Sequence, residues 1–94
     1  MNLDPVIKQE AQSLIKSGAA AQAIDLLEKH LQQNDACDEA WLLLGNAYRK
    51  LENWKSAMDS YSRAMELNPE SPARDAYNMI VEILNFYDIQ RYNV

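Results

Sequence analysis

The sequence has few of the residues that build catalytic, metal or phosphate sites. Its only histidine is His30, so it offers no metal cluster of the usual kind and no Ser-His pair at a plausible spacing. Glycine occurs only at positions 18 and 45, which excludes a Gly-rich phosphate loop. We therefore expect no enzyme activity, no metal and no cofactor.

Positive charge, cysteine and long apolar runs are also scarce. The chain has 9 Lys and Arg against 14 Asp and Glu, a net charge of −5, which argues against nucleic acid or an anionic membrane as the main partner. No apolar run approaches the ~20 residues of a membrane span, and the start MNLDPVIKQE lacks the layout of a signal peptide. A single cysteine, Cys37, allows no internal disulfide. These absences predict a cytoplasmic protein.

Proline positions and cap residues divide the chain into helices. We expect five helices, at about 5–17, 20–33, 39–51, 54–67 and 72–88. Pro5 and Pro72 suit the first position of a helix, where a missing N–H costs nothing. Cap candidates precede four of these helices, at Asp4, Asp38, Asn53 and Ser71. No alternating β-branched run leaves room for a sheet, so the predicted fold class is all-α.

One segment carries an ordered set of apolar and small residues, namely Trp41, Leu44, Gly45, Tyr48, Ala57, Tyr61 and Pro69. Trp41, Leu44 and Tyr48 share one helical face, and Gly45 has no side chain to hold a neighbouring helix away. Ala57 and Tyr61 form a small-large pair that lets two helices interlock. The spacing W-x₂-L-G-x₂-Y…A-x₃-Y…P resembles the tetratricopeptide repeat, a 34-residue helix-turn-helix unit. This resemblance implies a non-catalytic module that holds other proteins.

A shift of 34 residues reveals a second, degenerate copy of the pattern. Residues 4–37 then lie over 38–71 without a gap, with Ile7 over Trp41 and Leu27 over Tyr61. Glu10 and His30 depart from the family pattern. We expect one domain, 1–94: a right-handed solenoid of two repeats, 4–37 and 38–71, plus a closing helix, 72–88. The cap-like start and the lack of a trailing linker favour a complete protein over one end of a longer array.

The resemblance also places a binding groove. In the family the first helix of each repeat lines a concave surface, and its usual positions map here onto Lys8, Gln12, Ile15, Lys16, Glu39, Leu42, Leu43, Asn46, Arg49 and Lys50. Four of these residues are basic and one is acidic. The family's chaperone-binding branch clamps a peptide carboxylate with such residues, although Leu43 stands where that branch has asparagine. We expect the groove to bind an extended or helical partner segment that carries acidic residues or a free carboxylate. Alternatively, Lys16 and Lys50 are ordinary helix-end lysines.

The closing helix suggests an alternative function in assembly. Its apolar arc covers roughly three-fifths of the circumference when residues are placed at ~100° steps, more than one neighbouring surface needs. Met79, Ile83, Phe86 and Tyr87 remain on the side where a sixth helix would pack, which predicts a two-fold homodimer. The competing interpretation is that residues 89–94 fold back over this patch.

Other polar and aromatic residues have structural interpretations. We expect His30 to be hydrogen-bonded or half-exposed, Trp54 to belong to the core rather than to stack on a ligand, and the carboxylates of the second helices to lie on a solvated convex face. The side chains expected to be mostly buried are Ile7, Leu14, Ile24, Leu27, Trp41, Leu44, Tyr48, Trp54, Tyr61, Met65 and Ile80.

Overall fold

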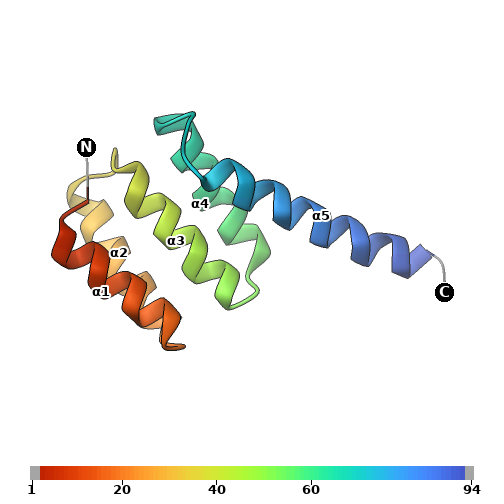
Figure 1. Cartoon of the computed structure of the whole chain (residues 1–94), viewed down its shortest axis with the longest axis horizontal. Coiled ribbons are helices and arrows are strands. Elements are labelled where there is room, and N and C mark those ends of the chain that lie inside the picture. The colour runs from red at the N-terminus through yellow and green to blue at the C-terminus, as the bar shows by residue number, and fades with distance from the viewer. Residues whose placement is uncertain (1–2, 93–94) are drawn as a thin grey trace.

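Over the part of the chain that the structure describes, five helices are arranged in two layers. The computed structural model describes residues 3–92, and side chains over residues 3–86. The helices are α1 (Pro5–Lys16), α2 (Ala20–Gln33), α3 (Asp38–Lys50), α4 (Trp54–Leu67) and α5 (Ala73–Tyr92). The described residues contain no strand, which confirms the predicted all-α class. Figure 1 shows the first helices, α1, α3 and α5, in front of the second helices, α2 and α4.

Three of the four predicted caps accept hydrogen bonds at helix starts as expected, and one does not. Asn53 Oδ1 accepts from the Ser56 N–H at 3.3 Å at the start of α4. Asp4 Oδ1 accepts from the Val6 N–H at 2.9 Å, and Ser71 Oγ accepts from the Ala73 N–H at 3.1 Å. The prediction of Asp38 as a cap is wrong, because Cys37 is the cap and α3 begins at Asp38 itself. The Asp38 carboxylate is in a position favoured by the helix dipole.

The turns inside the two repeats are the same structure. Gly18 and Glu52, which are 34 residues apart, both have positive φ, 92° and 59°. Two backbone hydrogen bonds close each turn in a Schellman motif. In the first turn, Gly18 N–H donates to the Ile15 carbonyl and Ala19 N–H to the Leu14 carbonyl. In the second turn, Glu52 N–H donates to the Arg49 carbonyl and Asn53 N–H to the Tyr48 carbonyl. The shared geometry supports the predicted 34-residue register.

The core lies in two clusters, one for each end of the array. Of the predicted core, the residues Ile24, Leu27, Leu44, Tyr61 and Ile80 are buried. The others are only partly buried, and they are Ile7, Leu14, Trp41, Tyr48, Trp54 and Met65.

α5 is longer than the sequence suggested. The predicted end at 88 is wrong, since the helix continues to Tyr92 through residues that include neither glycine nor proline. Ala73 and Ile80 are fully buried, whereas the C-terminal part of α5 extends away from the other helices in Figure 1. The interpretation that the tail folds back is therefore wrong as far as Tyr92. Residues 93–94 lie outside the described part of the chain.

Candidate functional site

The concave side has a hollow between the starts of the first helices and the α4–α5 connection. Its volume is about 420 Å³, and it is lined by Lys8, Gln12, Asp38, Glu39, Leu42, Leu43, Asn68, Ser71 and Pro72. Five of the ten predicted groove positions meet here: Lys8, Gln12, Glu39, Leu42 and Leu43. Leu43 is only 5% exposed, so it belongs to the floor of the hollow and to the core. The other predicted groove residues, Ile15, Lys16, Asn46, Arg49 and Lys50, do not line this hollow.

Lys8 is already paired in this hollow. Its Nζ lies 2.8 Å from Glu39 Oε2, while the Leu3 N–H donates to Glu39 Oε1 at 3.0 Å. The hydrogen bond from Lys8, followed by that from Leu3, lowers the pKa of Glu39, and the same bond to Glu39 raises the pKa of Lys8. The charge of Glu39 offsets that of Lys8, and Asp38 adds a second carboxylate to the same hollow. This end of the groove therefore does not have the basic character that the sequence suggested.

Positive charge collects at the other end of the first helices. Lys16 lies in the last turn of α1, and Arg49 and Lys50 lie in the last turn of α3, where the helix dipole favours cations. The two lysines are exposed and Arg49 is half-buried. Charge is thus polarised along the first helices, with carboxylates at the start of α3 and cations at the ends of α1 and α3.

Asn46 lies between these two ends and is held by the core. The Tyr61 hydroxyl donates to Asn46 Oδ1, which fixes the orientation of the carboxamide. Tyr61 is fully buried, and this burial raises the pKa of its phenol, an effect that Arg49 partly opposes. The Asn46 oxygen is therefore engaged within the fold.

A second hollow of about 450 Å³ lies beside α5. It is lined by Glu52, Trp54, Met79, Glu82, Ile83 and Phe86. Three of the four residues predicted for self-association come together here, and the side chain of the fourth, Tyr87, lies outside the described residues. Met79 and Phe86 are 51% and 56% exposed. Arg49 Nη1 donates to Met79 Sδ at 3.9 Å, so the two predicted surfaces touch each other.

Sequence reasoning missed part of this second hollow. Trp54 was assigned to the core, yet it is half-buried and also lines a groove on the other side of α5. Glu82 could have been found from its place three residues after Met79 and four before Phe86. Glu52 had no such signal, because its position depends on the fold of the α3–α4 turn.

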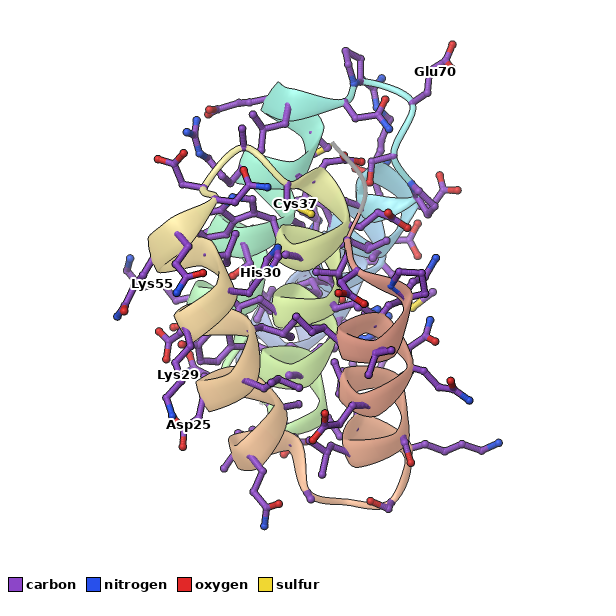
Figure 2. All side chains as sticks on the ribbon, turned by 90° about the vertical axis from the view of Figure 1, so that its left-hand side faces the viewer. Asp25, Lys29, His30, Cys37, Lys55 and Glu70 are labelled. Atoms are coloured by element: carbon purple, nitrogen blue, oxygen red, sulfur yellow. The ribbon has the colours of Figure 1, made fainter. Side chains whose placement is uncertain are left out.

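The face of the second helices looks like solvated surface. Figure 2 shows Asp25, Lys29 and Lys55 pointing outward, with His30 and Cys37 among the helices. Cys37 is fully buried. His30 is half-buried, in line with one of its two expected states, and its Nε2 has no hydrogen-bond partner among the described residues.

Two further features of the described residues concern metal binding and membranes. These residues contain no group of three or more His, Cys, Asp or Glu side chains placed to hold a metal ion. None of the helices, over the same part of the chain, combines the length and apolar character that crossing a membrane requires.

Several known proteins resemble this chain. A Bacteroides fragilis protein with a solution NMR structure is 43% identical, with a TM-score of 0.83 over 97% of this chain and 91% of that chain. Tetratricopeptide repeat protein 17 of Rattus norvegicus is 30% identical over 100 residues, and the cellulose synthase operon protein C of Escherichia coli K12 is 29% identical over 86 residues. The matches span 100% and 89% of this chain but only 8% and 7% of those two relatives.

The family comparison agrees with the helix pairs and the repeated turns. The profile of the C-terminal ARM domain of tetratricopeptide repeat protein 21 matches residues 9–88, which is most of the chain. Repeats of this kind generally mediate protein–protein interaction. The chain belongs to this family of tetratricopeptide-like helical repeats.

Proposed function

We propose that the chain is a non-catalytic interaction module that binds a segment of a partner protein along its concave side. The observation that carries this proposal is the distribution of charge along α1 and α3, with the hollow and the Lys8–Glu39 pair at one end and Lys16, Arg49 and Lys50 in the last turns. An elongated surface with opposite charges at its ends suits a segment in one orientation better than the reverse. A cytoplasmic location, expected from the sequence, stays a prediction.

The cations define the chemistry of one end of the partner segment. Lys8 is offset by Glu39, so an acidic side chain or a free carboxylate would meet Lys16, Arg49 and Lys50 instead. Exposed pairs of this kind contribute little singly and are screened by salt. Binding should therefore weaken as ionic strength rises.

The test is an NMR titration with a soluble acidic peptide, octaglutamate, and with octalysine as the opposite-charge control. We expect octaglutamate to shift amides near the ends of α1 and α3, and the variant Arg49→Glu with Lys50→Glu to weaken it about fivefold or more. The matched variant Lys29→Glu with Lys55→Glu changes the same charge on the outer face and should leave affinity nearly unchanged. Equal losses in both variants would reduce the effect to net charge and contradict the groove.

The alternative function is assembly of two copies through α5. The exposure of Met79 and Phe86 beside Ile83 favours it, because monomers seldom leave a contiguous apolar patch bare. Light scattering decides the matter. A dimer should become a monomer with unchanged helical content in the variant Met79→Glu with Phe86→Glu, and a wild-type chain that is monomeric at high concentration would exclude this alternative.

A further inference from the structure

The hollow beside α5 has an apolar floor with helical spacing. Met79, Ile83 and Phe86 follow one another at intervals of four and three residues, so they share one face of α5 over roughly 10 Å. Trp54, at the start of α4, adds an aromatic side chain to this floor. The volume of about 450 Å³ lies in the range that accommodates one or a few large side chains.

The rim of this hollow is acidic. The lining residues include two carboxylates, Glu52 and Glu82, and no Lys or Arg. Glu52 is fixed by the α3–α4 turn, where its φ is 59° and its N–H donates to the Arg49 carbonyl at 2.9 Å. The Arg49 guanidinium approaches the edge of the hollow, where it contacts the Met79 sulfur. The net charge of −5 adds a long-range attraction for cations.

The shape of the floor favours a helical ligand. A stripe at i, i+4 and i+7 is the surface against which the apolar stripe of a second helix packs. Leu84 lines a groove with Trp54, the first residue of α4, so α5 beyond Leu84 runs past the start of α4 (Figure 1). Phe86, at one end of the floor, lies in this part of α5, so a ligand helix that reaches it can extend past α4 in that direction.

We propose that this hollow binds a basic amphipathic helix of a partner protein. Apolar side chains of that helix contact Met79, Ile83 and Phe86, while flanking lysines or arginines reach Glu52 and Glu82. The proposal rests on the chain being an interaction module, but it uses an adjacent surface, which Arg49 of the groove only borders, and the opposite ligand charge. Failure of either test therefore leaves the other intact.

Charge distinguishes this ligand from a second copy of the chain. A pair of copies would place two acidic rims and two net charges of −5 against each other, which opposes association. A basic helix meets the same apolar floor with complementary charge. A second copy is therefore the competing occupant that the experiment must detect.

In the experiment, the whole chain is titrated with a designed helical peptide of leucine and lysine. Isothermal titration calorimetry measures the affinity, and NMR locates the binding site. Its controls are the glutamate version of the peptide and a scrambled leucine–lysine sequence without an apolar face. We expect the amphipathic basic peptide to bind and to shift amides of α5 between Met79 and Phe86. Glu52→Gln with Glu82→Gln should weaken binding about fivefold or more, whereas the matched Glu10→Gln with Glu70→Gln should not.

A second variant separates docking from simple charge attraction. Met79→Ala with Phe86→Ala keeps every charge, so a loss of affinity in this variant supports contact with the apolar floor. The proposal is overturned if the scrambled or glutamate peptide binds equally well, or if both Glu→Gln pairs behave alike. It is also overturned if light scattering shows a wild-type dimer that the basic peptide does not dissociate, because a second copy then occupies the hollow.

Discussion

Tyr61 fills the space that a side chain on Gly45 would need. A Cβ added to Gly45 would lie 2.5 Å from Tyr61 Cε1, well inside normal contact distance. The ring cannot move away easily, since Tyr61 is fully buried and its hydroxyl is bonded to Asn46. This single contact explains why the repeat has glycine at this position of α3.

Gly45→Ala is therefore expected to destabilise the fold through overpacking, by about 1–3 kcal/mol in spite of the better helix propensity of alanine. Urea denaturation followed by circular dichroism measures the loss. Adding Tyr61→Leu to Gly45→Ala removes the ring and should recover part of the lost stability. The recovery appears as a coupling energy in the double-mutant cycle. Additive losses in the two variants would contradict the assigned contact.

Glu39 should make stability depend on pH in the acid range. Its pKa is lowered in the folded chain, so its bonds to Lys8 and Leu3 stabilise the fold fully above the ordinary value near 4.5. This contribution is lost as pH falls below that value and through the lowered pKa. We expect Glu39→Gln to reduce stability at neutral pH and to flatten the acid limb of the stability profile. A profile identical to wild type below pH 4.5 would show that Glu39 is not coupled to folding.

For single residues, the sequence predicted which side chains share a surface better than it predicted which side chains bond to each other. Met79, Ile83 and Phe86 were found because helical periodicity alone puts them on one face. Lys8 and Glu39 were both placed on the groove, but their ion pair depends on the separation of α1 and α3 and on the path of Leu3. Glu52 joins the α5 hollow only through the turn that folds it there, so no local pattern could indicate it.

Among the elements, the two Schellman turns show one geometry built with different residues. Glycine adopts the left-handed region freely, whereas a residue with a Cβ does so at a cost of roughly 1–2 kcal/mol. Gly18 therefore fits its turn without strain, and Glu52 occupies the equivalent turn with strain. No heavy atom lies within 4 Å of an added Cβ at Gly18, so conformation rather than crowding decides the effect of a substitution there.

Opposite effects are expected from exchanging residues at these turns. Glu52→Gly should raise the free energy of unfolding by about 0.5–1 kcal/mol, because relief of the left-handed strain exceeds the added flexibility of the unfolded chain. Gly18→Ala should lower it by a similar amount. Thermal unfolding of both variants beside wild type is the measurement. The same sign for both substitutions would mean that the turns are not equivalent.

The bounds of the helices were predicted where the chain carries punctuation. Pro5, Pro72 and the cap residues placed the starts of α1 and α5 to within one residue. The end of α5 was missed, since residues 86–92 include no residue that stops a helix.

Across the whole molecule, stability should be distributed from neighbour to neighbour. The fully buried Leu27 belongs to the cluster around α1–α3, and the fully buried Ile80 belongs to the cluster between α4 and α5. Repeat arrays of this type have no single central core that every helix shares. Damage at one end should therefore be felt most strongly at that end.

Leu27→Ala and Ile80→Ala test this expectation as a matched pair. Each is expected to cost about 2–5 kcal/mol locally, since both side chains are fully buried. Hydrogen exchange should show Ile80→Ala lowering protection mainly in α5 and α4, and Leu27→Ala mainly in α1 and α2. Uniform loss of protection along the chain in both variants would mean that the array unfolds as one cooperative unit.

The two tryptophans give this small array two separate optical signals. Trp41 packs against both core clusters and donates its indole N–H to the Asp35 carbonyl at 2.8 Å, so its emission follows the junction of the repeats. Trp54 lies beside α5 and lines the hollow there. Its emission therefore reports separation of α5 from α4 or binding of a ligand in the hollow. If each tryptophan is replaced by phenylalanine in turn, the emission wavelength of the remaining tryptophan reports which end of the molecule has changed.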